Sequence, residues 1–366
     1  MKKVLVTAAV FSLFIGAGSV SAQTLTTVEE LGMRLYKSNL LSKDYTQSCD
    51  TCHSAANGFA DTTAVSLGDD LVSTGGRNAP TSAYAGFSPI LHQDQTGEWV
   101  GGMFWDGRAT GWRLHDPLAE QAQGPPENPV EMNNTREVIV ARIADPSTVD
   151  PRYADEAQVI QDLFIEVYGA DALFDPDLLD LAYDYLGRAI AAYERSFEVT
   201  SFTSTFDTGI LSTQEARGQK LFMKNCTTCH AYGRRGGDHP LFTNYKYVNA
   251  GVPLNDNLTT SKEDPNAHYS PPDYGLGAIP EVNDPAQIGK FKVPTLRNVA
   301  RTAPYTHNGY YDKLEDVVAF MNNNTKITPE VAENLNTRNL GLSQKQLEDI
   351  VAFLNALTDD LPLPTP

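Results

Sequence analysis

The clearest alternation of apolar and polar positions lies at residues 178–197, in the segment LLDLAYDYLGRAIAAYERSF. Apolar residues recur there every three to four positions, which is the period of an amphipathic α-helix. The same period returns at residues 343–357, in SQKQLEDIVAFLNAL. Both segments are therefore predicted to be helices that bury one face. The apolar stripe of the second segment consists of Leu347, Ile350, Val351, Leu354 and Leu357.

Three shorter segments show a helical pattern as well. Residues 28–41 read VEELGMRLYKSNLL, and residues 314–321 read LEDVVAFM. Residues 213–224 read TQEARGQKLFMK, and either Ser212 or Thr213 is suited to cap the start of that helix. These segments predict three further helices.

Two long stretches lack any helical period. Residues 68–134 are rich in Gly, Pro and Asn, and residues 231–289 are dense in Gly, Pro, Asn and Asp. The second stretch is too long to be an ordinary connection between helices. Little of the chain resembles a strand. The pattern therefore predicts an all-α, mainly helical and loop-rich fold.

The N-terminus carries the features of an export signal. It begins Met-Lys-Lys, continues through an apolar run at residues 4–17, and reaches Val20-Ser21-Ala22, which has the small-residue spacing of a cleavage site. The run is shorter than the roughly 20 residues that span a bilayer, and no later segment is long and apolar enough. We expect residues 1–22 to be a signal peptide and the protein to be exported to the periplasm without a membrane span.

Composition and charge narrow the class of protein. The chain is 20% charged and 41% hydrophobic, which is typical of a globular protein and not of a disordered one. The formal net charge is −18, and cleavage of the signal would make it more negative by removing Lys2 and Lys3. This charge opposes binding to phosphate backbones, so we expect no nucleic-acid partner.

All four cysteines fall in two Cys-x-x-Cys-His units, SCDTCH at residues 48–53 and NCTTCH at residues 225–230. In an exported chain the alternatives are two short disulfides or a zinc ion held by all four cysteines. Neither alternative explains the histidine that follows each pair. Covalent haem attachment does, because two thiols at this spacing bind the haem vinyl groups and the adjacent imidazole reaches the iron. The pattern predicts two covalently attached c-type haems, held by Cys49, Cys52 and His53 and by Cys226, Cys229 and His230.

The doubled motif indicates two cytochrome c-like modules, and the chain is long enough for two cores. We expect a first haem domain at residues 23–205 and a second at residues 206–342. Residues 343–366 would add a C-terminal helix and tail.

Beyond the haem motifs, three stretches resemble the bacterial dihaem cytochrome c peroxidase family. They are RNAPT at residues 77–81, FWDGRA at 104–109 followed by EQAQGPPENPVEM at 120–132, and FKVPTLRNVARTAPYTHNG at 291–309. The resemblance covers most of the mature chain. It implies that one haem receives electrons at high potential and that the other reduces hydrogen peroxide to water.

The resemblance also assigns roles to individual residues. Met321, which follows His307 by the family's spacing, would be the second axial ligand of the second haem, where a thioether raises the potential. Glu131 and Gln121 match the family's distal acid-base glutamate and distal glutamine at the first haem. Trp105 matches a tryptophan that lies between the haems.

A calcium ion between the domains is a further implication of the resemblance. Asn78 matches its side-chain ligand, and Thr302 and Pro304 match positions that offer backbone carbonyls. Dimerisation is expected from the resemblance alone.

The chain departs from the family pattern at one place. Many members close the first haem at rest with a histidine between the first haem motif and RNAP, but residues 54–76 contain none. We therefore hypothesise a first haem open to peroxide in the oxidised protein. His92 and His115, which lie in apparent insertions, are the candidates to replace the missing ligand.

The sequence favours a peroxidase that takes electrons from a small cytochrome c or copper protein. The first alternative is a dihaem oxidase of the methylamine-utilisation type, which oxidises tryptophans of a partner protein and has a tyrosine where this chain has Met321. The second is a dihaem electron carrier without catalytic activity, for which Glu131 would have no use.

Overall fold

A computed structural model describes residues 24–233, 239–258 and 272–360 of the chain. The predicted signal peptide, residues 1–22, lies outside the described residues. Within the described ranges, no helix is both long and apolar enough to cross a membrane.

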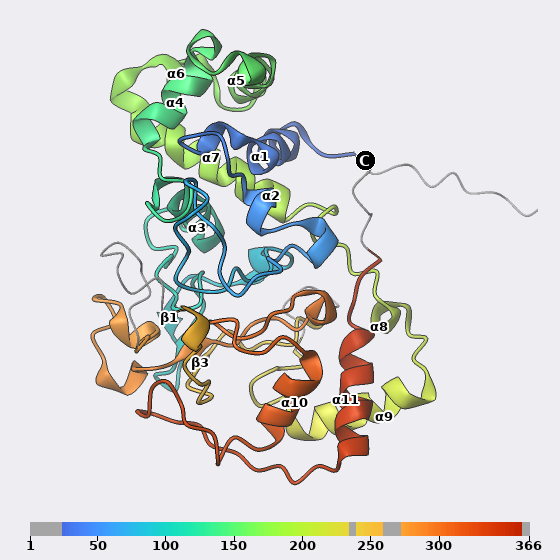
Figure 1. The fold of residues 1–366 in the computed structure, drawn as a ribbon. Helices are drawn as coiled ribbons and strands as arrows, with labels where there is room; N and C mark the ends of the chain where they lie inside the picture. Colours follow the sequence, from blue (N-terminus) through green and yellow to red (C-terminus); the bar gives the residue numbers. More distant parts are fainter. Residues whose placement is uncertain (1–23, 234–238, 259–271, 361–366) are drawn as a thin grey trace, which may run out of the picture.

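The chain folds into two helical units, drawn one above the other in Figure 1. The first unit is centred on α1 (Thr27–Lys37), which crosses α7 (Leu179–Glu194). The crossing is close because Gly32 lies against α7, where an added Cβ would be 1.9 Å from the carbonyl oxygen of Ala189. The other helices of this unit are α2 (Cys49–Cys52), α3 (Pro117–Glu127), α4 (Arg136–Ala144), α5 (Ala154–Tyr168) and α6 (Ala170–Phe174).

The second unit repeats this arrangement. Its α9 (Thr213–Asn225) crosses α11 (Gln344–Asn355), and an added Cβ at Gly218 would be 1.8 Å from the carbonyl oxygen of Asp349. Helix α10 (Leu314–Asn322) packs on α11, and the short α8 (Thr205–Thr208) precedes α9. The C-terminal helix therefore belongs to the core of the second unit.

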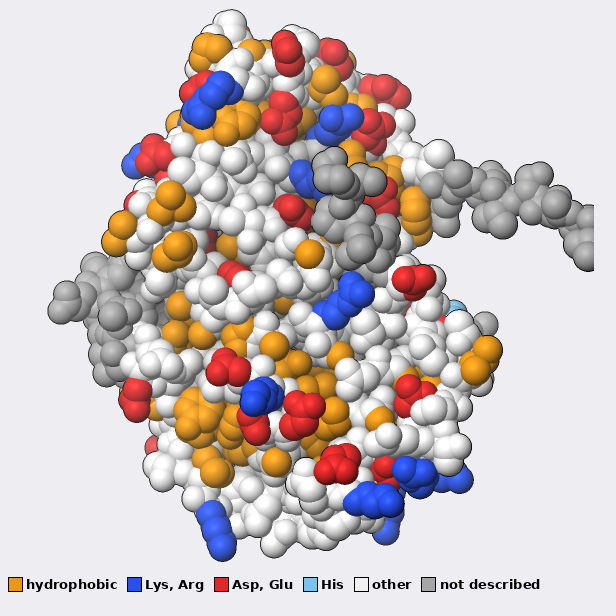
Figure 2. All heavy atoms as spheres, turned by 45° about the vertical axis from the view of Figure 1, so that its right-hand side comes forward, with side chains coloured by type: hydrophobic (Ala, Val, Ile, Leu, Met, Phe, Trp, Pro, Cys, Tyr) orange, Lys and Arg blue, Asp and Glu red, His pale blue; other side chains and the backbone are white. Residues whose placement is uncertain are grey.

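Each unit has its own hydrophobic core. The first core joins α1, α5 and α7, and the second joins α9, α10 and α11. Aromatic rings fill the centre of the second core, where Phe222 lies 5.8 Å from Phe242 and 5.3 Å from Phe353 between ring centroids. On the face drawn in Figure 2, apolar side chains gather over the second unit, and acidic side chains are scattered over both.

Strands are short and lie where the two units meet. Strand β1 (His92–Gln93) pairs antiparallel with β2 (Trp99–Val100), and β3 (Tyr247–Val248) pairs antiparallel with β4 (Phe291–Lys292). An isolated bridge between Val100 and Lys246 joins the two pairs. The remaining regular structure consists of short 3-10 turns, among them η1 (Asn39–Leu41), η3 (Ala85–Phe87) and η10 (Val299–Arg301).

Buried ion pairs also hold the units together. Arg77 of the first unit pairs with Asp106 of the same unit at 2.5 Å and with Asp273 of the second at 2.7 Å. All three side chains are at most 10% exposed. The hydroxyl of Tyr84 donates to Asp359 across the same boundary.

The mainly helical, two-module fold is confirmed, and all five helices predicted from periodicity are present. The segment at 28–41 is broken at Ser38, whose hydroxyl accepts from the amide of Leu40 and starts η1. Helix α3 was not predicted, because it lies in the Gly/Pro/Asn-rich stretch. It forms because Asp116 caps its first turn, accepting from the amides of Leu118 and Ala119. The proposed domain boundaries at residues 205 and 342 stay predictions.

Candidate haem sites

The first Cys-x-x-Cys-His unit forms a single helical turn. Ser48 and Thr51 cap it reciprocally, since each side chain accepts from the other residue's amide, at 3.3 Å and 3.0 Å. Cys49, Cys52 and His53 consequently line one cavity of about 140 Å³. The His53 Nδ1 lies 3.2 Å from the carbonyl oxygen of Phe59, so this nitrogen donates and Nε2 keeps its lone pair.

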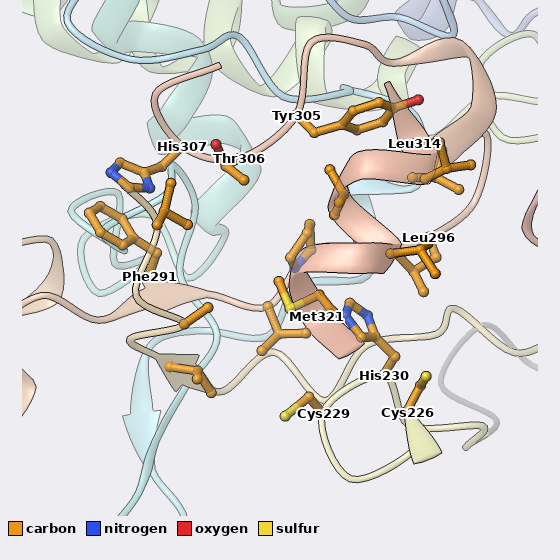
Figure 3. A pocket seen from close by; sticks show the side chains of 18 of the residues that line it. Cys226, Cys229, His230, Phe291, Leu296, Tyr305, Thr306, His307, Leu314 and Met321 are labelled. Atoms are coloured by element: carbon orange, nitrogen blue, oxygen red, sulfur yellow. The ribbon is translucent and has the colours of Figure 1, made fainter. Parts of the chain in front are cut away.

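The second unit follows directly from the end of α9. Cys226, Cys229 and His230 line a cavity of about 250 Å³, shown in Figure 3. The His230 Nδ1 is 2.9 Å from the carbonyl oxygen of Phe242, which again leaves Nε2 as the free nitrogen. Burial lowers the pKa of His230 to about 4 and also lowers the pKa of His53. Both imidazoles are thus neutral and able to bind a metal.

The residues of both cavities fit covalently attached haem better than the alternatives. All four cysteines are free, which argues against two short disulfides. Among the described residues, no group of three or more His, Cys, Asp and Glu side chains could hold a zinc ion. Burial raises the pKa of Cys52 and of Cys226 to about 11, so both side chains are neutral thiols in the cavity as described.

Met321 lies on α10 in the wall of the second cavity. In Figure 3 its sulfur and the imidazole of His230 face one another, with the two thiols below. His307 lines the same cavity, but it is stacked on Phe291 with 3.6 Å between ring centroids and lies 3.4 Å from the Glu330 carboxylate. The structure therefore brings together the two side chains that the sequence assigned to the second haem.

Glu131 and Gln121 line the first cavity together with His53. Gln121 projects from α3, and Glu131 follows that helix. Burial raises the pKa of Glu131, and the nearby Arg108 cation opposes the shift. The side-chain amide of Asn128 donates to Glu131 Oε1 at 2.8 Å and fixes its position. A buried carboxyl of this kind can hold and release a proton.

Trp105 lines both cavities. Its indole Nε1 donates to the carbonyl oxygen of Asn78 at 2.9 Å, and its own carbonyl accepts from the amide of Lys292 on β4 at 2.9 Å. The tryptophan is therefore fixed from both units at the wall between the two cavities.

The three residues assigned to calcium all line the second cavity. Asn78 uses its side-chain Nδ2 to bond the carbonyl of Thr63 at 3.2 Å, which leaves its Oδ1 as the atom available to a cation. Thr302 and Pro304 line the same cavity. Because backbone carbonyls would complete such a site, residue identity gives no signal for it.

Neither insertion histidine reaches a haem cavity. His92 is exposed on β1, where its Nδ1 lies 2.7 Å from the carbonyl oxygen of Ile90, and His115 is exposed as well. The loop before His115 is held by Glu120, whose carboxylate accepts from the backbone amides of Gly111, Arg113 and Leu114 at 2.7 to 2.8 Å. Among the described residues that line the first cavity, His53 is the one histidine.

Sequence reasoning assigned no role to three charged residues in the wall of the first cavity, Arg77, Arg108 and Glu194. Arg108 lies over the ring of Phe104, 3.7 Å from its centroid, and pairs with Asp106 at 3.1 Å. Glu194 is the last residue of α7 and is 4% exposed. Arg108 lies within the motif FWDGRA, which could have drawn attention to it. Glu194 lies in an amphipathic helix, where nothing in the sequence distinguishes it from its neighbours.

Both haem cavities lie in parts of the chain that are similar to known proteins. A family model described as di-haem cytochrome c peroxidase matches residues 26–216, and one described as cytochrome c matches residues 215–358. The chain is 38% identical over 362 residues to the methylamine utilization protein MauG of Paracoccus denitrificans, covering 90% of this chain and 88% of the relative. It is 30% identical over 346 residues to the cytochrome c551 peroxidase of Pseudomonas aeruginosa, covering 92% and 84%.

Solved structures agree with the sequence relatives. The diheme peroxidase BthA of Burkholderia thailandensis superposes with a TM-score of 0.75 at 26% identity, covering 92% of this chain and 87% of the other. A MauG-like protein associated with microbial copper homeostasis superposes with a TM-score of 0.66 at 27% identity, covering 93% of each chain.

Proposed function

The chain belongs to the dihaem cytochrome c peroxidase family, which also includes MauG proteins, and we propose that within this family it reduces hydrogen peroxide to water. The electrons would come from a small redox protein, a cytochrome c or a copper protein. The placement of Glu131 and Gln121 in the cavity of His53 is the observation that carries this proposal.

The two cavities are suited to different tasks. Haem bound at the two sites would supply one-electron redox chemistry and, at the first site, an iron to which peroxide has access. At the second cavity, the Met321 thioether opposite His230 would exclude substrate and favour a high potential. At the first, no second histidine faces His53 from the described residues, so peroxide would have room to enter.

Within the first cavity, Glu131 would move the peroxide proton from one oxygen to the other. Its raised pKa and its hydrogen bond from Asn128 are what this task needs. Gln121 would orient peroxide through its amide. Trp105, which lines both cavities, would carry electrons from the second site to the first.

Two features of the site and surface remain part of the proposal. A calcium ion would use Asn78, Thr302 and Pro304 and would stiffen the edge of the second cavity. The net charge of −18 and the scattered acidic side chains in Figure 2 favour a donor with a basic docking face. We also propose that the protein is exported to the periplasm, as the predicted signal peptide at residues 1–22 implies.

A MauG-type oxidation of a protein or organic substrate is the second candidate. It is favoured by the 38% identity to the Paracoccus denitrificans protein and by the lack of a histidine opposite His53. Met321 favours the peroxidase, because a thioether ligand suits a haem that accepts electrons from a carrier.

The test is steady-state consumption of peroxide by the holoprotein with a reduced small cytochrome c, compared with Glu131→Gln. We expect turnover in the wild type and a fall of about 10²- to 10⁴-fold in kcat for the variant, because proton transfer is lost. Glu137→Gln, at an exposed position of α4, is the control and should behave as wild type.

Peroxide-dependent oxidation of an added protein without turnover of the cytochrome would instead support the MauG-type activity. No reaction with peroxide at all would favour the electron carrier.

A further inference from the structure

A second carboxyl lies buried in the wall of the first cavity, apart from Glu131. Glu194 ends α7, against which α1 and α3 pack, and lines the cavity together with Cys49 of α2. It is 4% exposed, and its Oε2 has no hydrogen-bond partner in the part of the chain that the structure describes. A buried, unpartnered carboxylate oxygen is unfavourable, so the group is expected to be neutral unless something in the cavity compensates it.

The groups that face Glu194 do not supply that compensation. Burial raises the pKa of Glu194 to about 8; Arg195 opposes the shift and Asp116 adds to it. Arg195 is itself engaged, since its guanidinium donates to Asp116 at 2.7 Å. The phenols of Tyr36 and Tyr193 and the thiol of Cys49 also interact with Glu194, and all three are neutral. On α3, which packs on α7, Glu120 is bonded to loop amides and Glu127 pairs with Arg136, and η3 carries no titratable side chain.

Cys49 also shows which part of the cavity Glu194 adjoins. This cysteine is one of the two attachment points of the first haem, and its pKa is raised by burial and by the Glu194 charge. The attachment edge of a porphyrin is hydrocarbon and thioether, with no polar group to bond a carboxylate. The charge of Glu194 and the charge of the first haem site would therefore interact across a region of low dielectric constant, where charges are weakly screened.

We propose that Glu194 binds one proton when one electron enters the first haem site and releases it when the electron leaves. The electron comes from the second haem, the proton comes from solvent, and the only bond formed is the O–H bond on the carboxylate. The ionised Glu194 carboxylate stabilises the oxidised haem site, because that site is more positive than the reduced one. By reciprocity, reduction of the site raises the affinity of Glu194 for a proton. Glu194 thus acts through the charge of the haem site and is not itself a catalytic residue. The inference rests on the haem at Cys49 and Cys52 and not on peroxide chemistry.

The experiment is a potentiometric titration of the first haem in the holoprotein, from about pH 6 to about pH 10, where a carboxyl of raised pKa titrates. In the wild type the midpoint potential falls as Glu194 ionises with rising pH. In Glu194→Gln that fall disappears. Glu198→Gln, four residues along and outside the cavity, is the matched control and keeps the wild-type profile. A Glu194→Gln protein that retains the wild-type slope overturns the proposal.

A measurement on the wild type covers the case in which Glu194→Gln does not fold. The infrared difference between reduced and oxidised holoprotein should show the carbonyl stretch of a protonated carboxyl gained on reduction, shifted in D₂O. The band should persist in Glu131→Gln, which separates it from the peroxide acid. The absence of the band, or its loss in Glu131→Gln, contradicts the proposal. Peroxide is absent from both experiments, so their outcome is independent of whether the protein is a peroxidase.

Discussion

Met321 is the residue on which the character of the second site depends most. It lies partly buried on α10, and Figure 3 shows its sulfur facing His230. Methionine is often only a flexible filler of apolar space. Here the same side chain ends in a cavity lined by two thiols and a neutral imidazole, where we propose that its sulfur is a ligand.

We predict that Met321→Leu lowers the midpoint potential of the second haem and slows its reduction by the donor. Leucine keeps the volume but removes the sulfur, so folding should change by less than about 1.5 kcal/mol. Potentiometric titration followed by absorption spectra measures the potential. Met223→Leu, on the exposed side of α9, serves as the control. Equal potentials in the two variants would show that Met321 is not a ligand.

Single residues differed in how far sequence could place them. Cys49, Cys52 and His53 are neighbours in the chain, so their spacing alone predicts their shared cavity. Glu131 and Trp105 were found through long motifs and not through any local rule. Glu194 was missed because its significance depends on burial, which arises only when other helices such as α1 and α3 pack on α7.

Each haem motif follows a helix that crosses a second helix at a glycine. Gly32 provides the close approach between α1 and α7, and Gly218 provides it between α9 and α11. Periodicity predicted all four helices, because each buries one apolar face. It could not predict which helices pair, since partners lie far apart in the chain and any apolar stripe fits several others.

We predict that Gly218→Ala destabilises the second unit by about 1–3 kcal/mol or more, because the new Cβ would meet the Asp349 carbonyl oxygen and force α9 and α11 apart. Thermal unfolding of the holoprotein, followed by circular dichroism and by absorption of the second haem, measures the loss. Gly233→Ala is the comparison, since a Cβ there meets nothing within 4 Å. An unchanged melting temperature for Gly218→Ala would mean that the crossing is looser than described.

The two units meet at a boundary where buried charge holds them in place. Arg77 sits between Asp106 and Asp273, which belong to different units. The same boundary carries Trp105, fixed by bonds to Asn78 and Lys292. The sequence could suggest two modules but not this contact, because nothing local pairs Arg77 with a carboxylate nearly two hundred positions away.

We predict that Arg77→Ala destabilises the protein by about 3–5 kcal/mol at neutral pH, because it leaves two buried carboxylates without a cation. Burial alone would raise the pKa of Asp106, but Arg77 and Arg108 lower it to about 2, and the pKa of Asp273 is lowered too. The stabilisation is therefore present above the ordinary pKa of aspartate and is lost as pH falls toward 2.

Denaturant unfolding of wild type and Arg77→Ala across this pH range tests the prediction. The difference between the two proteins should shrink on acidification. Arg152→Ala, which removes an exposed pair with Asp150, should cost less than about 1 kcal/mol at any pH. A difference for Arg77→Ala that is independent of pH would assign the loss to packing alone.

The hold of Glu120 on the loop before His115 has a consequence for the timing of the reaction. Three backbone amides before His115 donate to the Glu120 carboxylate, and Asp116, the next residue, caps α3. The backbone is therefore held by hydrogen bonds on both sides of His115. To reach the first haem, this histidine would have to break those bonds in a local unfolding event. A first site that no loop has to vacate would react at the rate at which its small substrate arrives, without an induction period while the chain rearranges.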